Sequence, residues 1–134
     1  FLSCYEFGGK EKRFEGGLLG HWCVWTKKAV ELLESVKEYR ATGKGADFLF
    51  KAGPAITDMN SAVFDSINNF AGCISGIHEV LHRQGLMKNI ICLDEIEKLS
   101  SGQAEDITRV SRSYPQFTDD DFVRENIEKW KNQV

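Results

Sequence analysis

The sequence predicts a mostly α-helical fold of four or five helices, with little strand. From residue 18 onwards, apolar residues recur at steps of three and four, which places them on one face of a helix. Capping residues, glycines and prolines mark positions at which such helices would begin and end. We find no internal repeat, so we expect one irregular helical arrangement rather than a repeat array.

Length and composition limit the class of protein. At 134 residues the chain suits one small domain and is too short for two. Its net charge of −3 argues against a nucleic-acid partner, because phosphate binding needs a basic surface. No apolar run approaches the roughly 20 residues of a membrane helix. Four cysteines without a CxxC pair, and no signal-peptide pattern, favour buried thiols in the cytoplasm.

The first helix is expected from Leu18 to Thr42. Gly43 follows as a stop signal, and the segment 43–45 is a glycine-rich connection. The residues expected to share the buried face are Leu18, Trp22, Trp25, Ala29, Leu32, Leu33 and Val36.

The middle of the chain carries the longest regular pattern. Residues 48–50 are a candidate for one helical turn, and Pro54 suits an early position of the next helix, where its missing N–H is not needed. Asn68 and Asn69 are expected to divide the pattern into two helices, the second of which Gly85 closes. The apolar residues at steps of three and four are Ile56, Met59, Val63, Ile67, Phe70, Ile74, Ile77 and Leu81.

The fourth helix follows a short candidate strand at 89–93. Ser100 and Gln103 fit a capping box, with Ser100 as the N-cap and Gln103 reaching back. The helix they open should bury Ile107 and Val110, and should stop before Pro115.

The last helix has a separate start signal. Thr118 is expected to be its N-cap, and the acidic run 119–121 suits the positive end of the helix dipole. Phe117 is expected to pack on Phe122 as a hydrophobic staple. The stripe expected to be buried comprises Val123, Ile127 and Trp130.

His78, Glu79 and His82 form an HExxH motif, in which two histidines ligate zinc and the glutamate activates a water molecule. Gly85 fits the longer HExxHxxGxxH pattern, but Lys88 occupies the third ligand position, and a protonated lysine cannot ligate a metal. We therefore assign no metal ligand. A small peptidase-like zinc hydrolase stays open as an alternative that metal analysis of the chain would decide.

Three further motifs have ordinary structural explanations. The glycine-rich segment 16–20 could hold a phosphate before a helix, but it lacks the P-loop lysine, and a close-packed turn is favoured. His21, Trp22 and Trp25 could line a ligand pocket, although aromatic residues at helical spacing are usually core. The run 119–121 lacks the spacing of a calcium loop.

Segments from residue 69 to residue 130 resemble the C-terminal region of the dihydrodipicolinate synthase/N-acetylneuraminate lyase family. The resemblance rests on FAGCISGIHEVL, RQGLM, CLD, LSSGQ, Tyr114-Pro115 and DDDFV. Upstream, GLLGHW and the residues up to Glu34 are similar to the passage from the last barrel strand into the eighth helix. Together these segments cover about three quarters of the chain, and the similarity is to a little-characterised branch of the family.

The resemblance implies a (β/α)₈ barrel with a C-terminal helical extension. Because a whole barrel needs about 250 residues, the chain would hold its last portion. Residues 1–17 would be the end of the barrel or a flexible segment. Residues 18–134 would be the last barrel helix and the extension. The partners implied are the remainder of the barrel and further copies in a homo-oligomer.

The resemblance also implies the chemistry of the complete protein. Family members form a Schiff base between a strand-borne lysine and a pyruvate-like keto acid, helped by a tyrosine. Both residues would lie upstream of Phe1, so we assign no catalytic, cofactor or metal residue, and we expect the segment to be inactive alone. His82 would replace an arginine, and His78 would cap or pack its helix. The remaining alternative is a helical interaction module. The lysines that lie outside strand-like apolar runs are Lys10, Lys12, Lys27, Lys28 and Lys44.

Overall fold

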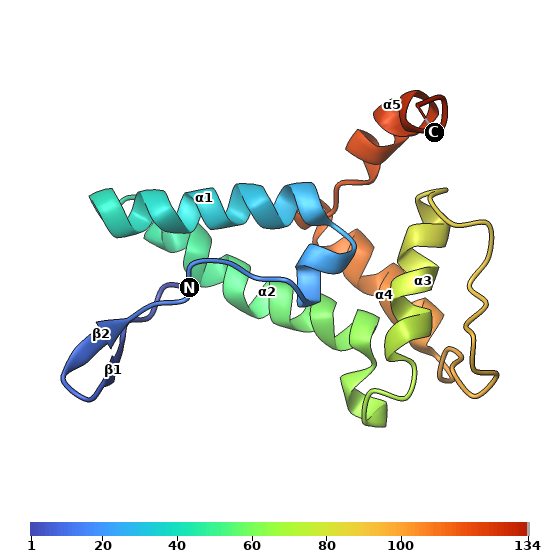
Figure 1. Ribbon diagram of the computed structural model, residues 1–134, viewed down its shortest axis with the longest axis horizontal. Coiled ribbons are helices and arrows are strands. Elements are labelled where there is room, and N and C mark those ends of the chain that lie inside the picture. Colours follow the sequence, from blue (N-terminus) through green and yellow to red (C-terminus); the bar gives the residue numbers. More distant parts are fainter. Residues whose placement is uncertain (134) are drawn as a thin grey trace.

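The structure, a computed structural model, describes residues 1–133 and is mostly helical, as the sequence predicts (Figure 1). A hairpin of β1 (Tyr5–Phe7) and β2 (Lys10–Lys12) comes first. The α-helices are α1 (Thr26–Thr42), α2 (Ala46–Phe64), α3 (Cys73–Arg83), α4 (Gln103–Ser113) and α5 (Asp120–Lys131). Three short 3₁₀ helices are η1 (Gly20–Cys23), η2 (Ser66–Asn68) and η3 (Pro115–Phe117).

Helix α2 is the centre of the fold. It runs antiparallel to α1 and packs against α3 and α4, whereas α5 stands apart beyond α4 (Figure 1). The core lies where α2 meets α4, and Met59, Val63, Ile107 and Val110 have no exposed surface there. Burial of four such side chains contributes about 1.5–3 kcal/mol each. None of the helices within residues 1–133 is long and apolar enough to cross a membrane.

The first helix begins later than the sequence predicts. Leu18 is 88% exposed and belongs to no helix, and η1 is separated from α1 by a bend at Trp25. This bend turns His21 and Trp25 into the interior, at 4% and 1% exposure. The predicted stop is confirmed, because α1 ends at Thr42 and the Gly43 N–H donates to the Tyr39 carbonyl.

Helix α2 includes Pro54 in its interior, so the prediction that this proline lies early in a helix is wrong. The helix starts eight residues earlier, at Ala46, and residues 48–50 belong to it. A proline here removes the bond to the carbonyl of Phe50. Phe50 is 72% exposed, so water can reach this turn. Gly53 precedes the proline, and the absence of a Cβ relieves the usual clash at that position.

The helical path is interrupted between α2 and α3, in the region where the two asparagines predicted a division. Asp65, Asn69 and Phe70 adopt positive φ angles of 56°, 55° and 64°, and η2 lies between them. The apolar stripe does not continue through this break, because Ile67 is 82% and Phe70 57% exposed. Gly85 follows the end of α3, and its N–H donates to the His82 carbonyl.

A buried polar junction joins the end of α2 to the starts of α3 and α4. Asp65, 2% exposed, accepts hydrogen bonds from Ser100 Oγ at 2.5 Å, Asn68 Nδ2 at 2.7 Å and the Gly72 N–H at 2.9 Å. Burial alone would raise the pKa of Asp65. The bonds from Ser100, Asn68 and Gly72 lower it and prevail, so the pKa lies below its ordinary 3.8. The carboxylate therefore stays charged inside the fold.

Gln103 completes this junction. Its Nε2 donates to the carbonyls of Ala62, Val63 and Gly72 at 3.3, 3.2 and 3.0 Å, and its Oε1 accepts the Ser100 N–H at 3.1 Å. The predicted reach of Gln103 back to Ser100 is confirmed. Ser100 itself is not the N-cap, because its hydroxyl donates to Asp65 and Gly102 occupies the cap position.

The segment between α3 and α4 contains no strand within residues 84–102, so the candidate strand at 89–93 is wrong. Ile91 and Leu93 are 75% and 110% exposed, and no neighbouring strand is placed to pair with them. Helix α4 follows its prediction. Ile107 and Val110 are fully buried, and the helix ends at Ser113, before Pro115.

Helix α5 starts differently from its prediction. Asp119, not Thr118, occupies the N-cap position, and the Thr118 hydroxyl donates to the Pro115 carbonyl. The staple is also wrong. Phe117 packs against Phe48, with ring centroids 6.0 Å apart, whereas Phe122 contacts Trp130. Phe117 is the last residue of η3, which turns its ring towards α2. Of the predicted stripe, Val123 is 5% exposed, and the other two residues are half-buried.

Residues 1–17 contain the β1–β2 hairpin, which the sequence analysis missed. Gly8 and Gly9 form its turn with φ angles of 56° and 74°, a conformation that a two-residue hairpin loop requires and that glycine adopts readily. The sequence signal for this hairpin was the pair Gly8-Gly9 between two short segments. The first of these segments, Tyr5–Phe7, contains two aromatic residues that favour β-strands. The hairpin projects from the helical body (Figure 1).

Candidate functional site

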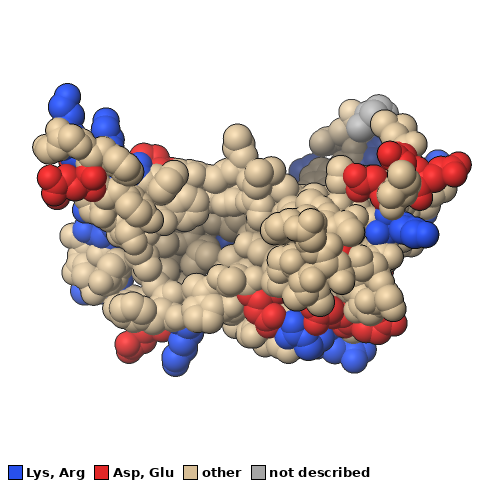
Figure 2. Space-filling model, turned by 90° about the horizontal axis from the view of Figure 1, so that it is seen from below, with Lys and Arg blue, Asp and Glu red and all other residues tan. Residues whose placement is uncertain are grey.

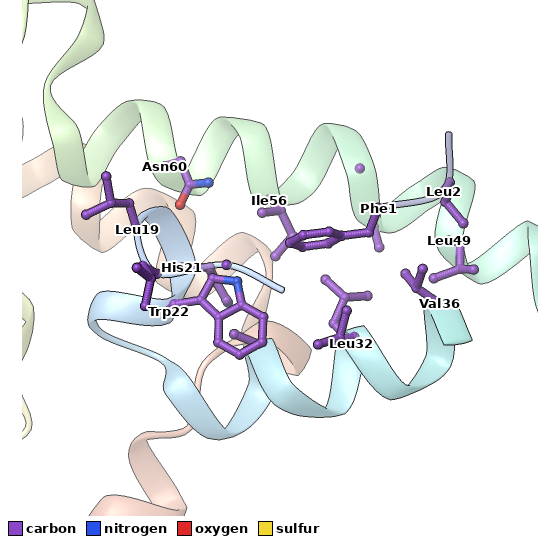
Figure 3. Close-up of a pocket in the computed structure, with 16 residues that line it drawn as sticks. Phe1, Leu2, Leu19, His21, Trp22, Leu32, Val36, Leu49, Ile56 and Asn60 are labelled. Atoms are coloured by element: carbon purple, nitrogen blue, oxygen red, sulfur yellow. The ribbon is translucent and has the colours of Figure 1, made fainter. Parts of the chain in front are cut away.

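One apolar hollow of the molecule lies between α1, α2 and the first residues of the chain. It has a volume of about 330 Å³ and is bordered by sixteen residues. Figure 3 shows Phe1 and Leu2 over the gap between Leu32 and Val36 of α1 and Leu49 and Ile56 of α2. The space-filling view is hollowed near its middle, where its surface is mostly uncharged (Figure 2).

The polar groups at this hollow are few. Among the described lining residues no side chain carries a full charge at neutral pH, and the polar side chains are those of His21, Trp22 and Asn60. A concave apolar wall of this size suits an apolar group with one or two hydrogen-bonding atoms. It offers no lysine for a Schiff base and no carboxylate for acid–base catalysis. The hollow can therefore bind an apolar group, but its described lining residues supply no nucleophile for catalysis.

Among the described lining residues, His21 has the one titratable side chain. Its Nε2 lies 2.6 Å from the Phe117 carbonyl oxygen, which can only accept, so Nε2 carries the proton. Nδ1 is buried without a partner in the described part of the chain. Burial disfavours the imidazolium and lowers the pKa of His21 to about 4, although the Phe117 bond opposes this shift. Neutral His21 thus ties η1 to η3.

This pKa makes stability depend on pH. The unfolded imidazole binds a proton near pH 6.5, whereas the folded one resists to about pH 4, so the unfolded state holds more protons between these values. We expect the free energy of unfolding to fall as the pH drops through this window, by at most roughly 1.4 kcal/mol per pH unit from this group. Urea denaturation at pH 7 and pH 5 measures the change.

The matched control is His21→Gln, whose amide can still donate to Phe117 but does not titrate. The difference between the two proteins isolates His21 from the carboxylates and the other histidines. Equal losses of stability in both proteins would show that His21 ionises as readily in the folded state as in the unfolded one.

The three HExxH residues of α3 each contact a different partner. His78 Nδ1 lies 3.5 Å from Cys92 Sγ, and His82 Nδ1 lies 3.0 Å from the Met87 carbonyl. Glu79 accepts a bond from Arg83 at 2.8 Å. Within residues 1–133, no three or more His, Cys, Asp or Glu side chains are grouped to hold a metal ion. The motif residues therefore do not form one centre in this arrangement.

Arg83 explains why Glu79 matters to the fold. Its guanidinium also donates to Thr108 Oγ1 and the Ala104 carbonyl, each at 2.9 Å. Glu79 thus orients a side chain that links α3 to α4. The Glu79 carboxylate is therefore engaged by an arginine of its own helix, and this arginine makes the contact with α4.

The glycine-rich segment and the aromatic trio have packing roles. A Cβ on Gly17 would lie 2.5 Å from Trp22 Nε1, so the close approach of this indole requires glycine there. The segment precedes η1, a single four-residue turn, and not an α-helix. The trio is divided, because His21 and Trp22 border the hollow whereas Trp25 lies in the core.

The acidic run 119–121 makes hydrogen bonds to the start of α1 and the end of α3, and an ion pair within α5. Asp119 Oδ2 accepts the Lys27 N–H in the first turn of α1 at 3.0 Å, and its Oδ1 accepts from Gln84 Nε2 at 3.0 Å. Burial raises the pKa of Asp119, although these bonds oppose the shift. Asp121 pairs with Arg124 within α5. Asp119 therefore caps α1 from a distant part of the sequence, a role that local patterns do not reveal.

The lysines lie on the surface. Lys10 and Lys12 are in the hairpin, Lys44 is in the turn between α1 and α2, and Lys27 and Lys28 pair with Glu31. The sequence analysis missed the buried polar junction at Asp65. Two local signals pointed to it: the Ser100–Gln103 pattern, and the spacing of Gly72 and Gly76, because small residues four apart allow close helix packing. Comparisons of the chain with protein-family models, curated proteins and solved structures give no match.

Proposed function

We propose that this chain is the C-terminal helical part of a Schiff-base-forming lyase or aldolase that acts on pyruvate-like keto acids. The observation that supports this best is the hollow between α1 and α2, which is apolar and lined by no charged side chain among the described residues. Side chains of a preceding barrel would fill such a hollow. The segment would then have a structural or oligomerising role, and the catalytic lysine and tyrosine would be borne by the barrel.

Two further features are consistent with this role. The surfaces of Leu18 and Leu19 are 88% and 77% exposed beside the hollow, which is unusual for a helical unit that acts alone. The four cysteines are free thiols, in keeping with the cytoplasm as the compartment of the complete protein.

The reading frame upstream of Phe1 tests the proposal first. A barrel-coding sequence with a lysine on its sixth strand is expected, and its absence would overturn the proposal. The protein that includes this region should then be incubated with pyruvate and borohydride, which reduces a Schiff base to a stable amine. Mass spectrometry should find one adduct on the strand lysine. The present chain alone, with only surface lysines, serves as the control and should remain unmodified.

A further inference from the structure

One face of the β1–β2 hairpin combines exposed aromatic rings with positive charge. The strand register pairs Tyr5 with Lys12 and Phe7 with Lys10, and paired residues project from the same face. Phe14 joins this face, with its ring centroid 5.7 Å from that of Tyr5. The three rings are 43%, 66% and 61% exposed in chain order. We call these five residues the hairpin face.

The hairpin face lacks cover in the described part of the chain. The remaining paired residues, Glu6 and Glu11, occupy the opposite face, so the two sides of the hairpin differ in charge. Every residue of both strands is exposed. A lone two-stranded hairpin is marginally stable in water, and three exposed rings add a reason for a partner.

The opposite end of the molecule carries a complementary surface. Residues 91–97 are part of the strandless segment before α4, which lies far from the hairpin in Figure 1. Ile91, Leu93 and Ile96 are 75%, 110% and 81% exposed there. Asp94, Glu95 and Glu97 stand among them, and the first basic residue is Lys98, after the segment. We call residues 91–97 the acidic loop.

We propose that a second copy of this chain covers the hairpin face, with the acidic loop of one copy docked on the hairpin face of the next. Each surface supplies what the other needs, because exposed rings would meet exposed aliphatic side chains and two lysines would meet carboxylates. The two surfaces lie at opposite ends of the molecule, so the hairpin face and the acidic loop of one copy cannot contact each other (Figure 1).

This contact joins two different surfaces, so it is a head-to-tail interface. Such interfaces propagate into rings when the rotation closes and into open chains when it does not. Both surfaces are small, and small interfaces hold transient complexes. Association should therefore depend on protein concentration and weaken with added salt, because the charges are exposed and screened. The association does not depend on the proposed lyase chemistry.

Charge reversal on each surface tests the proposal. One variant carries Lys10→Glu with Lys12→Glu, and the other carries Glu95→Lys with Glu97→Lys; Asp94 stays because its carboxylate accepts the Ile96 N–H. Sedimentation equilibrium should show that each variant alone associates at least about tenfold more weakly than the wild type, since like charges then face each other. An equimolar mixture of the two variants should recover association, because each reversed surface meets its complement.

The matched control for the hairpin variant is Lys44→Glu with Lys51→Glu, which makes the same change in net charge as that variant at two exposed sites outside both surfaces. It should associate like the wild type. Phe7→Ser, at a ring that is 66% exposed, should weaken association without lowering the melting temperature. A wild-type chain that stays monomeric at all concentrations would overturn the proposal. So would variants that associate normally, or a mixture that fails to recover.

Discussion

Gly76→Ala is expected to lower the free energy of unfolding by about 3 kcal/mol, because overpacking a close helix contact forces backbone to move. A Cβ on Gly76 would overlap the Val63 carbonyl oxygen and lie 2.6 Å from Gln103 Nε2. The first of these atoms belongs to the backbone of α2, so no side-chain rotation relieves the overlap. Helix α3 would have to shift away from α2. Urea denaturation followed by circular dichroism measures the loss.

Gly16→Ala is the control for this substitution. A Cβ at that position meets open space, and its φ is not in the left-handed region, so stability should change by less than about 0.5 kcal/mol. If Gly76→Ala is as stable as this control, α2 and α3 are not in close backbone contact at Gly76. Loss of all cooperative unfolding would agree with the expected direction and exceed the expected size.

Gln103→Leu is expected to lower the free energy of unfolding by about 3 kcal/mol, since three carbonyls and one N–H each lose a hydrogen bond to the amide, at roughly 1 kcal/mol per bond or slightly less. Leucine has a similar volume, so the effect reports hydrogen bonds more than a cavity. The carbonyls of Ala62, Val63 and Gly72 lie at the buried end of α2 and the start of α3. Water cannot readily replace the amide there, because Gln103 is only 4% exposed. Urea unfolding again gives the value.

Gln116→Leu makes the same chemical change on an exposed residue of η3 and should cost less than about 0.5 kcal/mol. A double variant of Gly76→Ala and Gln103→Leu extends the test, because the two sites contact each other. Its loss should be smaller than the sum of the single losses, since removal of the amide relieves part of the clash with the new Cβ. Strict additivity would contradict a shared junction.

The elements that the sequence predicted best are those whose signals are local. Ile107 and Val110 are three residues apart in α4 and both are buried, and Pro115 ends that helix for a covalent reason. Gly43 likewise ends α1 through a bond within four residues. In such cases periodicity and capping involve only neighbouring residues, and the rest of the fold does not alter them.

The contacts of the HExxH residues could not be predicted from local patterns. The spacing of His78, Glu79 and His82 predicts one side of a helix, and the three residues do lie on α3. The same spacing does not predict their contacts. In the structure, the side chains of His78, Glu79 and His82 contact Cys92, Arg83 and Met87, respectively. Metal binding needs three donors converging on one point, and that convergence is a property of the assembled fold.

By itself, then, the sequence determined the helical class of this protein, the ends of α1 and α4, and the break after α2. Tertiary structure decided which polar groups serve which helix. Asp119 caps α1 across 92 positions of sequence, and Ser100 donates to Asp65 instead of capping α4. The reason is that a buried donor or acceptor must find a partner in three dimensions, and the nearest partner in space is often distant in sequence.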